Sequence, residues 1–321
     1  MIGFSRSARI NIGVMAILAI LPVFFWWTGQ TFYLSLATRL VILAIAAVSL
    51  NLILGYGGLI SFGHAAYIGI GAYAVGIPAH HALYGGMDFI ASNNGFFQIA
   101  LAVVAAAVFA LITGAICLRT KGVYFIMITM AFAQMVYYFF VSIEEYGGDD
   151  GLVIDTRSEF PLVNLDQPIV LFLVSYVVLV LAMWLVNAIV NSRFGMVLQS
   201  AKGNNDRTVT LGYNTYLYRL TAYVISGAMC GLAGALLGNF ATFISPEMMD
   251  WSRSGELMFM VILGGTATAL GPVLGAAVFV VVAQFLSELT IYWHLPFGLM
   301  LIAVVLFARG GLSGILRGKG S

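Results

Sequence analysis

Residues 55–73 read GYGGLISFGHAAYIGIGAY, and six of these nineteen residues are glycine. Glycine costs about 1 kcal/mol relative to alanine inside a helix, and polar side chains such as those of Ser61 and His64 are costly to bury in apolar surroundings. The stretch nevertheless lies between long hydrophobic runs. It therefore predicts a break at the ends of two membrane spans near Gly57 and Gly58, followed by tight helix packing at Gly69 and Gly71.

The composition of the chain sets the fold class. Of its 321 residues, 61% are hydrophobic and only 8% are charged, and the mean hydropathy is +1.01. Soluble domains carry about 25% charged residues. A soluble core of this size could not hide so much apolar surface, whereas a bilayer accepts it on the outside of the protein. We therefore expect an all-α, polytopic integral membrane protein with a single transmembrane domain over residues 1–321.

A helix needs about 20 apolar residues to cross the hydrocarbon core of a bilayer. Ten runs are candidates, but the third and the eighth are short or interrupted by glycine, so eight full spans with re-entrant segments is an alternative. The first run ends at Trp26 and Trp27 without a small-residue cleavage site, which predicts a retained span. The ten runs are 12–27, 33–54, 60–77, 97–118, 123–141, 169–190, 220–240, 257–268, 273–289 and 296–308.

The charged residues sort to opposite sides of these spans. With ten spans and a cytoplasmic N-terminus, eleven of the fourteen basic residues fall in or beside cytoplasmic segments. An excess of Lys and Arg marks cytoplasmic loops, so both termini are predicted to be cytoplasmic. The eleven are Arg6, Arg9, Arg119, Lys121, Arg193, Lys202, Arg207, Arg219, Arg309, Arg317 and Lys319. The acidic residues predicted outside are Asp88, Glu144, Glu145, Asp149, Asp150, Asp155, Glu159, Asp166, Glu247, Asp250, Glu256 and Glu288, and Arg157 and Arg253 join them.

Two hydrophilic segments connect the spans. Residues 144–168 are acidic and rich in turn formers, and we expect them to form an external cap or docking surface. Residues 191–219 form the longest cytoplasmic segment and mix apolar with polar residues, a pattern typical of short helices that lie along the membrane surface.

The sequence offers no catalytic site. Ser61 and His64 have no acidic partner within the spans, and neither a GxSxG motif nor a phosphate-binding loop occurs. The two cysteines, Cys117 and Cys230, and the pair His80 and His81 do not form a metal-ligand set. We therefore expect no catalytic residue, metal or cofactor, and any nucleotide hydrolysis must come from another chain.

A stand-alone secondary carrier or channel for small polar solutes is the alternative function. Ion-coupled carriers usually hold a charged residue near the middle of the membrane. Here Arg39 and Glu288 lie close to the predicted ends of spans, and the runs are otherwise nearly free of charge. No coupling residue is evident, although backbone carbonyls at broken helices could still bind sodium.

Two further glycine clusters have different predicted roles, one in helix packing and one in a helix break. Two pairs, Gly227 with Gly231 and Gly234 with Gly238, have the four-residue spacing that lets helices approach closely. Residues 264–278, which begin Gly264-Gly265-Thr266, interrupt a span that is too short to cross cleanly. Such breaks survive in a membrane only where protein or a wet cavity satisfies the backbone, so this cluster either lines a pathway or packs.

Four stretches together resemble the LivM-type permease subunits of branched-chain amino acid ABC importers. They are LNLILGYGGLISFGHAAYIGIGAYA at 50–74, LRTKGVYFIMITMAFAQM at 118–135, NSRFGMVLQSAKGNNDRTVTLGYNTYLYRLTAYVISGAMCGLAGAL at 191–236 and MVILGGTATALGPVLGAAV at 260–278. The resemblance implies a bacterial inner-membrane permease that pairs with a LivH-type permease. It also implies two cytoplasmic ATPases, and a periplasmic binding protein that delivers branched-chain or related amino acids. Urea or short amides are other substrates of similar systems. Membrane lipid surrounds the spans, and no nucleic acid is expected.

The resemblance also assigns roles to residues. Within 191–219, the residues expected to couple transport to the ATPases are Lys202, Asn204, Asp206, Arg207, Leu211, Gly212, Tyr213 and Asn214. Gly203 and Asn205 stand where the family usually has glutamates, which leaves open which ATPase pair docks. Polar or glycine residues in the membrane runs are candidates to line the translocation pathway, with helix packing or capping an equal alternative for each. These are Asn51, Gly57, Gly58, Ser61, His64, Thr129, Gln134, Gly264, Gly265 and Thr266.

Overall fold

The computed structural model describes residues 6–86, 90–161, 164–290, 292, 294–307 and 311–317, without the side chains of 6–12, 301, 303–307 and 315–317. Asp88, Arg309 and Lys319 of the charge map and the last residue of the tenth predicted run lie outside the described residues. The same holds for the side chains of Arg6, Arg9 and Arg317.

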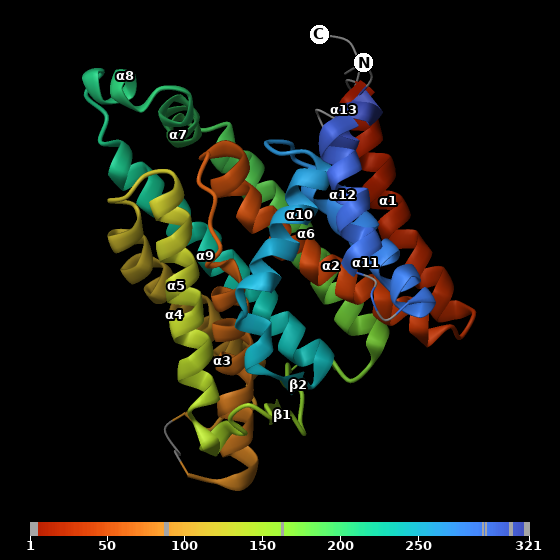
Figure 1. Cartoon of the computed structure of the whole chain (residues 1–321). Coiled ribbons are helices and arrows are strands. Elements are labelled where there is room, and N and C mark those ends of the chain that lie inside the picture. The colour runs from red at the N-terminus through yellow and green to blue at the C-terminus, as the bar shows by residue number, and fades with distance from the viewer. Residues whose placement is uncertain are drawn as a thin grey trace.

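The described chain is almost entirely helical, which confirms the all-α prediction (Figure 1). The α-helices are α1 Arg6–Trp27, α2 Thr31–Asn51, α3 His64–Tyr84, α4 Gly95–Cys117, α5 Val123–Val141, α6 Pro168–Val190, α7 Arg193–Gly203, α8 Asn205–Thr210, α9 Thr215–Ala241, α10 Trp251–Gly264, α11 Gly271–Leu289, α12 His294–Phe307 and α13 Gly311–Arg317. Single turns form at η1 Leu52–Tyr56, η2 Glu144–Tyr146 and η3 Pro246–Met249, and two short strands at β1 Leu152–Val153 and β2 Phe243–Ile244.

Six helices of the described chain are long and apolar enough to cross a bilayer: α2 with η1, α4, α5, α6, α9 and α11. The apolar part of α1, Gly13–Trp27, is shorter, and α10 and α12 have 14 residues each. A multi-pass membrane protein is therefore confirmed. Ten spans stays a prediction.

The two glycine-broken runs differ from the prediction at their boundaries. The sequence predicts the third run at 60–77, but α3 begins at His64 and continues to Tyr84. Residues 57–63 are not α-helical, because Gly58 has a φ of +70°, which ends the π-helical turn η1. The sequence predicts the eighth run at 257–268, but α10 starts at Trp251, where Asp250 caps it, and ends before Gly265, whose φ is +110°.

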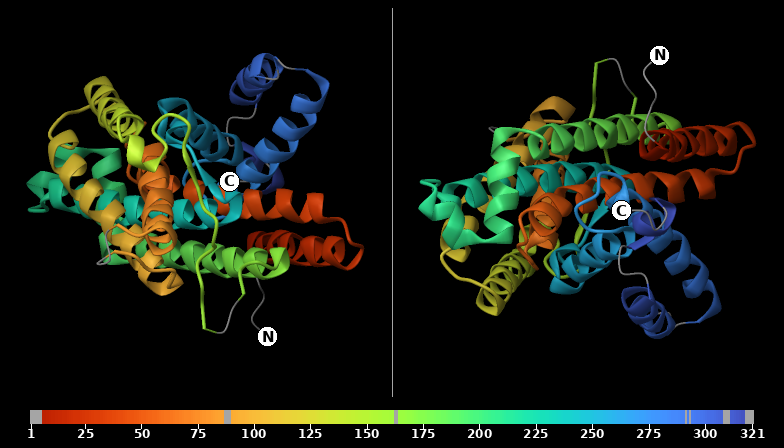
Figure 2. Two further views of the ribbon diagram at one scale, coloured as in Figure 1. Left: turned by 90° about the horizontal axis from the view of Figure 1, so that it is seen from below. Right: turned by 90° about the horizontal axis from the view of Figure 1, so that it is seen from above.

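Helices α2 and α9 form the centre of the bundle. In an apolar stretch of 18 residues in each of these helices, 78% of the residues of α2 with η1 and 61% of those of α9 are buried. The corresponding fractions for α4, α5, α6 and α11 are 17–33%. Seen along the bundle, α3, α4 and α5 lie on one side, and α1, α11 and α12 on the other (Figure 2). The exposed apolar side chains of the outer helices suit contact with lipid.

Glycine and alanine let α9 approach α3 and α4 closely, as the four-residue spacing predicts. A Cβ added to Gly234 would lie 2.0 Å from the carbonyl oxygen of Ile68 on α3, and one added to Gly71 would lie 2.0 Å from that of Gly231 on α9. On its other side, Gly231 packs against Ala106 of α4. Only small residues allow this approach, so packing is the role of these glycines.

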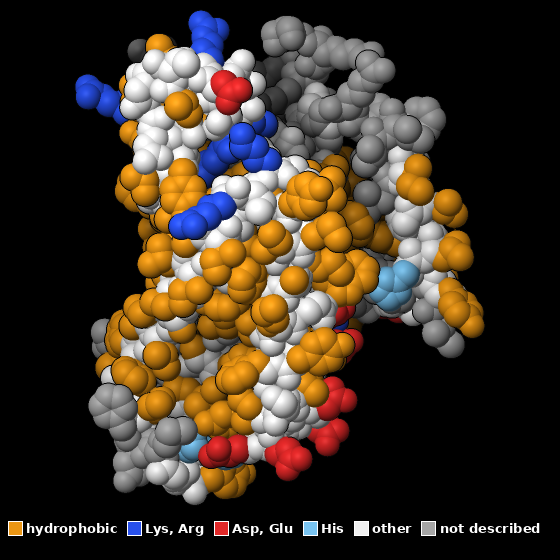
Figure 3. Space-filling model, turned by 60° about the vertical axis from the view of Figure 1, so that its left-hand side comes forward, with side chains coloured by type: hydrophobic (Ala, Val, Ile, Leu, Met, Phe, Trp, Pro, Cys, Tyr) orange, Lys and Arg blue, Asp and Glu red, His pale blue; other side chains and the backbone are white. Residues whose placement is uncertain are grey.

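The two ends of the bundle carry opposite charge. On the face in Figure 3, Lys and Arg gather at the end that holds α7 and α8, Asp and Glu gather at the opposite end, and apolar side chains cover the middle. The opposite end is closed by a small cap formed by residues 144–161 and the end of α9. Strands β1 and β2 pair antiparallel in it, and Asn239 of α9 accepts a hydrogen bond from the Ser158 amide at 2.9 Å.

Candidate functional site

The break after α2 lies against the segment that the sequence assigns to coupling. Lys202, at the end of α7, donates a hydrogen bond from Nζ to the carbonyl oxygen of Gly55 at 2.6 Å. Gly58 gives this side chain room, since a Cβ there would lie 2.8 Å from Lys202 Cγ. A second bond ties the segment to α9, from the Arg219 guanidinium to the carbonyl oxygen of Ala201 at 2.9 Å. A movement of α7 would therefore be transmitted directly to the end of α2.

The second break, between α10 and α11, meets the first one. The Asn51 side chain donates to the carbonyl oxygen of Thr268 and accepts from the amide of Ala267, both at 3.0 Å. Ala267 has a φ of +58°, which is strained for a residue with a Cβ. Glycine is required at Gly55, where a Cβ would lie 2.1 Å from the Asn51 oxygen. Asn51 is 1% exposed and thus holds the backbone of the second break.

The predicted coupling residues fall into two groups. Asn204 and Asn214 accept hydrogen bonds from the first turns of α8 and α9, and Gly212, with a φ of +90°, makes the turn between those helices. These three, with Lys202, shape and anchor the segment. The side chains of Asp206, Arg207, Leu211 and Tyr213 are exposed. With Val209 they form an exposed surface on α8 and the turn that follows it, and Leu211 is 67% exposed.

Three predicted pathway residues are buried where they support the start of α3. His64 is bonded through Nε2 to the Ser226 hydroxyl at 2.9 Å, and Ser226 in turn donates to the carbonyl oxygen of Ser49. Ser61 lies 3.4 Å from the Tyr223 hydroxyl, and Thr129 Oγ1 accepts from the amide of Phe62. Ser61, His64 and Thr129 are at most 1% exposed. In this conformation they satisfy non-helical backbone and join helices, and they do not line the cavities described below.

The remaining pathway candidates are distributed differently. Gly57, Gly264 and Gly265 are buried, and Gly264 packs against α11, since a Cβ on it would lie 1.7 Å from the carbonyl oxygen of Gly271. Gly58 and Thr266 are exposed at the breaks. Gln134 is partly exposed and donates to Asp250 at 2.8 Å.

The contact between Gln134 and Asp250 shows that some charged residues lie deeper in the bundle than the sequence predicts. Gln134 is the twelfth of the nineteen residues of α5, so Asp250 lies at the depth of a span and not in an external segment. Arg253 and Glu256 follow in the first two turns of α10, and both line cavities together with Arg39 of α2. A charged residue inside an apolar run is the signal for such a site. Arg39 carries that signal, whereas the other two appeared to belong to a loop.

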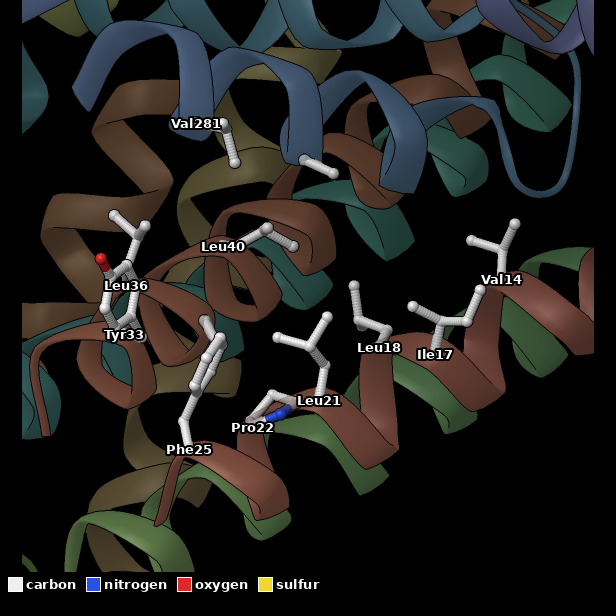
Figure 4. A pocket seen from close by; sticks show the side chains of 12 residues that line it. Val14, Ile17, Leu18, Leu21, Pro22, Phe25, Tyr33, Leu36, Leu40 and Val281 are labelled. Carbon is white, nitrogen blue, oxygen red and sulfur yellow. The ribbon is translucent and has the colours of Figure 1, made fainter. Parts of the chain in front are cut away.

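A larger cavity, of about 450 Å³, lies between α1, α2 and α11 (Figure 4). Its walls are the side chains of residues such as Ile17, Leu21, Phe25 and Leu40, and Tyr33 supplies its one hydroxyl. The amino and carboxylate groups of an amino acid would lose their hydrogen bonds to water here without replacement. This cavity is suited to an apolar chain such as that of a lipid.

Comparisons with known proteins identify the family of the chain. A family model described as "Branched-chain amino acid transport system / permease component" matches residues 32–308. The chain belongs to this family. It is 26% identical over 306 residues to the high-affinity branched-chain amino acid transport system permease protein LivM of Salmonella typhimurium, and 25% identical to LivM of Escherichia coli, with 88% of this chain and 70% of each relative covered.

A more distant relative is a probable permease protein LivH of Methanocaldococcus jannaschii, 25% identical over 183 residues, which cover 51% of this chain and 56% of the relative. No solved structure gives a significant match. Membership of this permease family makes the chain a membrane transport subunit. The family match includes both helix breaks and the whole α7–α8 segment.

Proposed function

We propose that this chain is one permease subunit of an ATP-driven importer of branched-chain or related amino acids in a bacterial inner membrane. The family and its LivM relatives support the substrate class. Its whole length acts as one transmembrane domain beside a homologous, LivH-type permease. Both termini and α7–α8 face the cytoplasm, where two ATPase subunits dock. The cap around β1 and β2 faces a periplasmic binding protein.

One observation carries the coupling role: the α7–α8 segment is exposed on one side and anchored to the helix breaks on the other. Leu211 and Tyr213 present apolar surface outward, while Lys202 bonds to the Gly55 carbonyl oxygen. Asn51 extends this connection to the start of α11. ATP binding draws the two ATPases together, and α8 moves with them. The breaks then carry the movement into α2 and α10, so that the permease pair alternates between inward-facing and outward-facing states.

Arg207 and Leu211 allow this proposal to be tested. We expect Leu211→Asp or Arg207→Ala to abolish amino acid uptake and the ATPase activity stimulated by the binding protein, because each removes exposed docking surface on α8. Affinity of the binding protein for its ligand is unchanged. Arg119→Ala is the matched control for Arg207→Ala, since Arg119 is exposed between α4 and α5 and outside the segment. Full uptake by Leu211→Asp would contradict the coupling role of α8.

A further inference from the structure

Three charged side chains at span depth are not used by the coupling machinery. Arg39 is the ninth residue of α2, and Arg253 and Glu256 lie one turn apart on α10. They are not at a loop, since α10 starts where Asp250 meets Gln134, in the second half of α5. Charges at this depth are expensive and usually face a bundle interior or a pathway. Their position therefore calls for a ligand or a partner.

The charges within this cluster are unbalanced. Arg253 Nη1 donates to both carboxylate oxygens of Glu256, at 3.2 and 3.1 Å. Within the described part of the chain, Arg39 is exposed and its guanidinium makes no hydrogen bond or ion pair. Glu288, the acidic residue on neighbouring α11, accepts a bond from Gln284. The cluster thus offers one free guanidinium, and its formal net charge is +1 with two arginines and one glutamate.

Two cavities meet at this cluster. Arg39, Arg253 and Glu256 line both of them, together with Leu43. The larger, of about 290 Å³, continues between α2, α3, α9 and α10, and its other walls are the apolar side chains of Ile68, Leu237, Phe240, Ala241, Met248, Leu257 and Met260. The smaller, of about 140 Å³, extends along α11 to Gln284 and Ser287. Drug-sized ligands occupy cavities of about 300 Å³ or more, so the larger cavity suits a smaller molecule.

A small zwitterion with an aliphatic side chain matches these features. A guanidinium binds a carboxylate through two parallel hydrogen bonds, and Arg39 is free to do so. The Glu256 carboxylate can accept from an ammonium group on its remaining lone pairs, and the apolar chamber beside it offers contacts to a branched side chain. Because Glu256 stays shared with Arg253, the ammonium is not held tightly, as passage requires.

We propose that Arg39, Glu256 and the chamber lined by Leu237 form a transient binding station for the transported amino acid. The carboxylate lies on Arg39, the ammonium on Glu256 and the aliphatic side chain in the chamber. This inference rests on the proposed function. It places the substrate contacts at Arg39, Glu256 and Leu237 and not at the polar side chains near the helix breaks.

The first test removes the free guanidinium. The complete transporter, containing this chain, its partner permease, both ATPases and the binding protein, is reconstituted in proteoliposomes with ATP inside. We expect Arg39→Gln to lower leucine uptake by about tenfold or more, because a charged partner of the carboxylate is lost, and Arg39→Lys to recover part of it. Stimulated ATP hydrolysis persists, because α7–α8 is intact. Arg119→Gln, at an exposed site between α4 and α5, keeps full uptake.

The second test changes the shape of the chamber. Leu237→Phe fills part of it and should lower the ratio of leucine to valine uptake by about tenfold, since pockets discriminate single methylene groups to that extent. The binding protein is the same in both measurements, so any change in the ratio belongs to this chain. A purely structural role of Leu237 would lower both rates together.

Three results would overturn the station. If Arg39→Gln takes up leucine at the wild-type rate, the station is wrong and the proposed function still stands. Loss of the partner permease from purified Arg39→Gln complexes would show that Arg39 pairs with that subunit instead. Failure of the wild-type complex to take up leucine, isoleucine or valine would overturn both the proposed function and the station.

Discussion

The Asn51 clamp gives the sharpest prediction for the helix breaks. Asn51→Leu keeps most of the side-chain volume but cannot form hydrogen bonds. It leaves the Ala267 amide and the Thr268 carbonyl, each now bonded at 3.0 Å, without that partner. An unsatisfied buried group costs about 1–3 kcal/mol, but Ala267 is exposed and Thr268 partly exposed, so water replaces part of each bond and the two losses together lower the free energy of unfolding by about 2 kcal/mol. With about 2–4 °C per kcal/mol, Tm falls by about 4–8 °C.

The assay is thermal unfolding of the purified chain in detergent, followed through tryptophan fluorescence. Asn187→Leu is the matched control, because Asn187 is exposed at the end of α6 and bonds only to Asn191 in the same turn. Exposed substitutions of this kind stay within about 0.5 kcal/mol. If Asn51→Leu unfolds within about 1 °C of the control while uptake is lost, Asn51 serves transport directly and the clamp is refuted.

Three other substitutions test the packing, the anchor and the orientation. Gly234→Ala forces α9 away from the Ile68 carbonyl oxygen, 2.0 Å from the new Cβ, and should cost about 1–3 kcal/mol of unfolding free energy; Gly203→Ala, with no atom within 4 Å, is the control, and equal Tm values would contradict the packing. Lys202→Met removes the bond to the Gly55 carbonyl oxygen. We expect ATP-driven uptake to fall about fivefold, because the loss of a charge-assisted hydrogen bond costs less at an exposed position than at a buried one. Unchanged uptake would show that the anchor is dispensable. A cysteine at Asp206 should be labelled only from the cytoplasm and one at Glu144 only from outside, and the reverse pattern would invert the proposed topology.

The helical class and the short helices α7 and α8 could be predicted from the sequence, because both depend on local patterns. Apolar runs predict spans, and the mixed polarity of residues 191–219 predicts the short helices that form α7 and α8. The packing glycines Gly231 and Gly234 could be recognised from their spacing alone. The resemblance to the LivM-type family also rests on sequence, and the family match confirms it.

The depth of a residue could not be predicted in the same way, because it depends on where a broken helix starts. Hydropathy places Arg253 and Glu256 in an external loop, but α10 begins beside Gln134, so both lie within the bundle. The partner of Asn51 is more than 200 positions away in the chain, and no local pattern identifies it. Polar residues such as His64 were equally compatible with a pathway or with packing, and only tertiary contacts distinguish the two.

Uptake of radiolabelled leucine into proteoliposomes tests the central claim most directly. Vesicles that contain this chain with its partner permease, both ATPases and the binding protein should accumulate leucine when ATP is present inside, and vesicles with this chain alone should accumulate none. Uptake by the chain alone, driven by a proton or sodium gradient without ATP, would contradict the account and make the protein a secondary carrier.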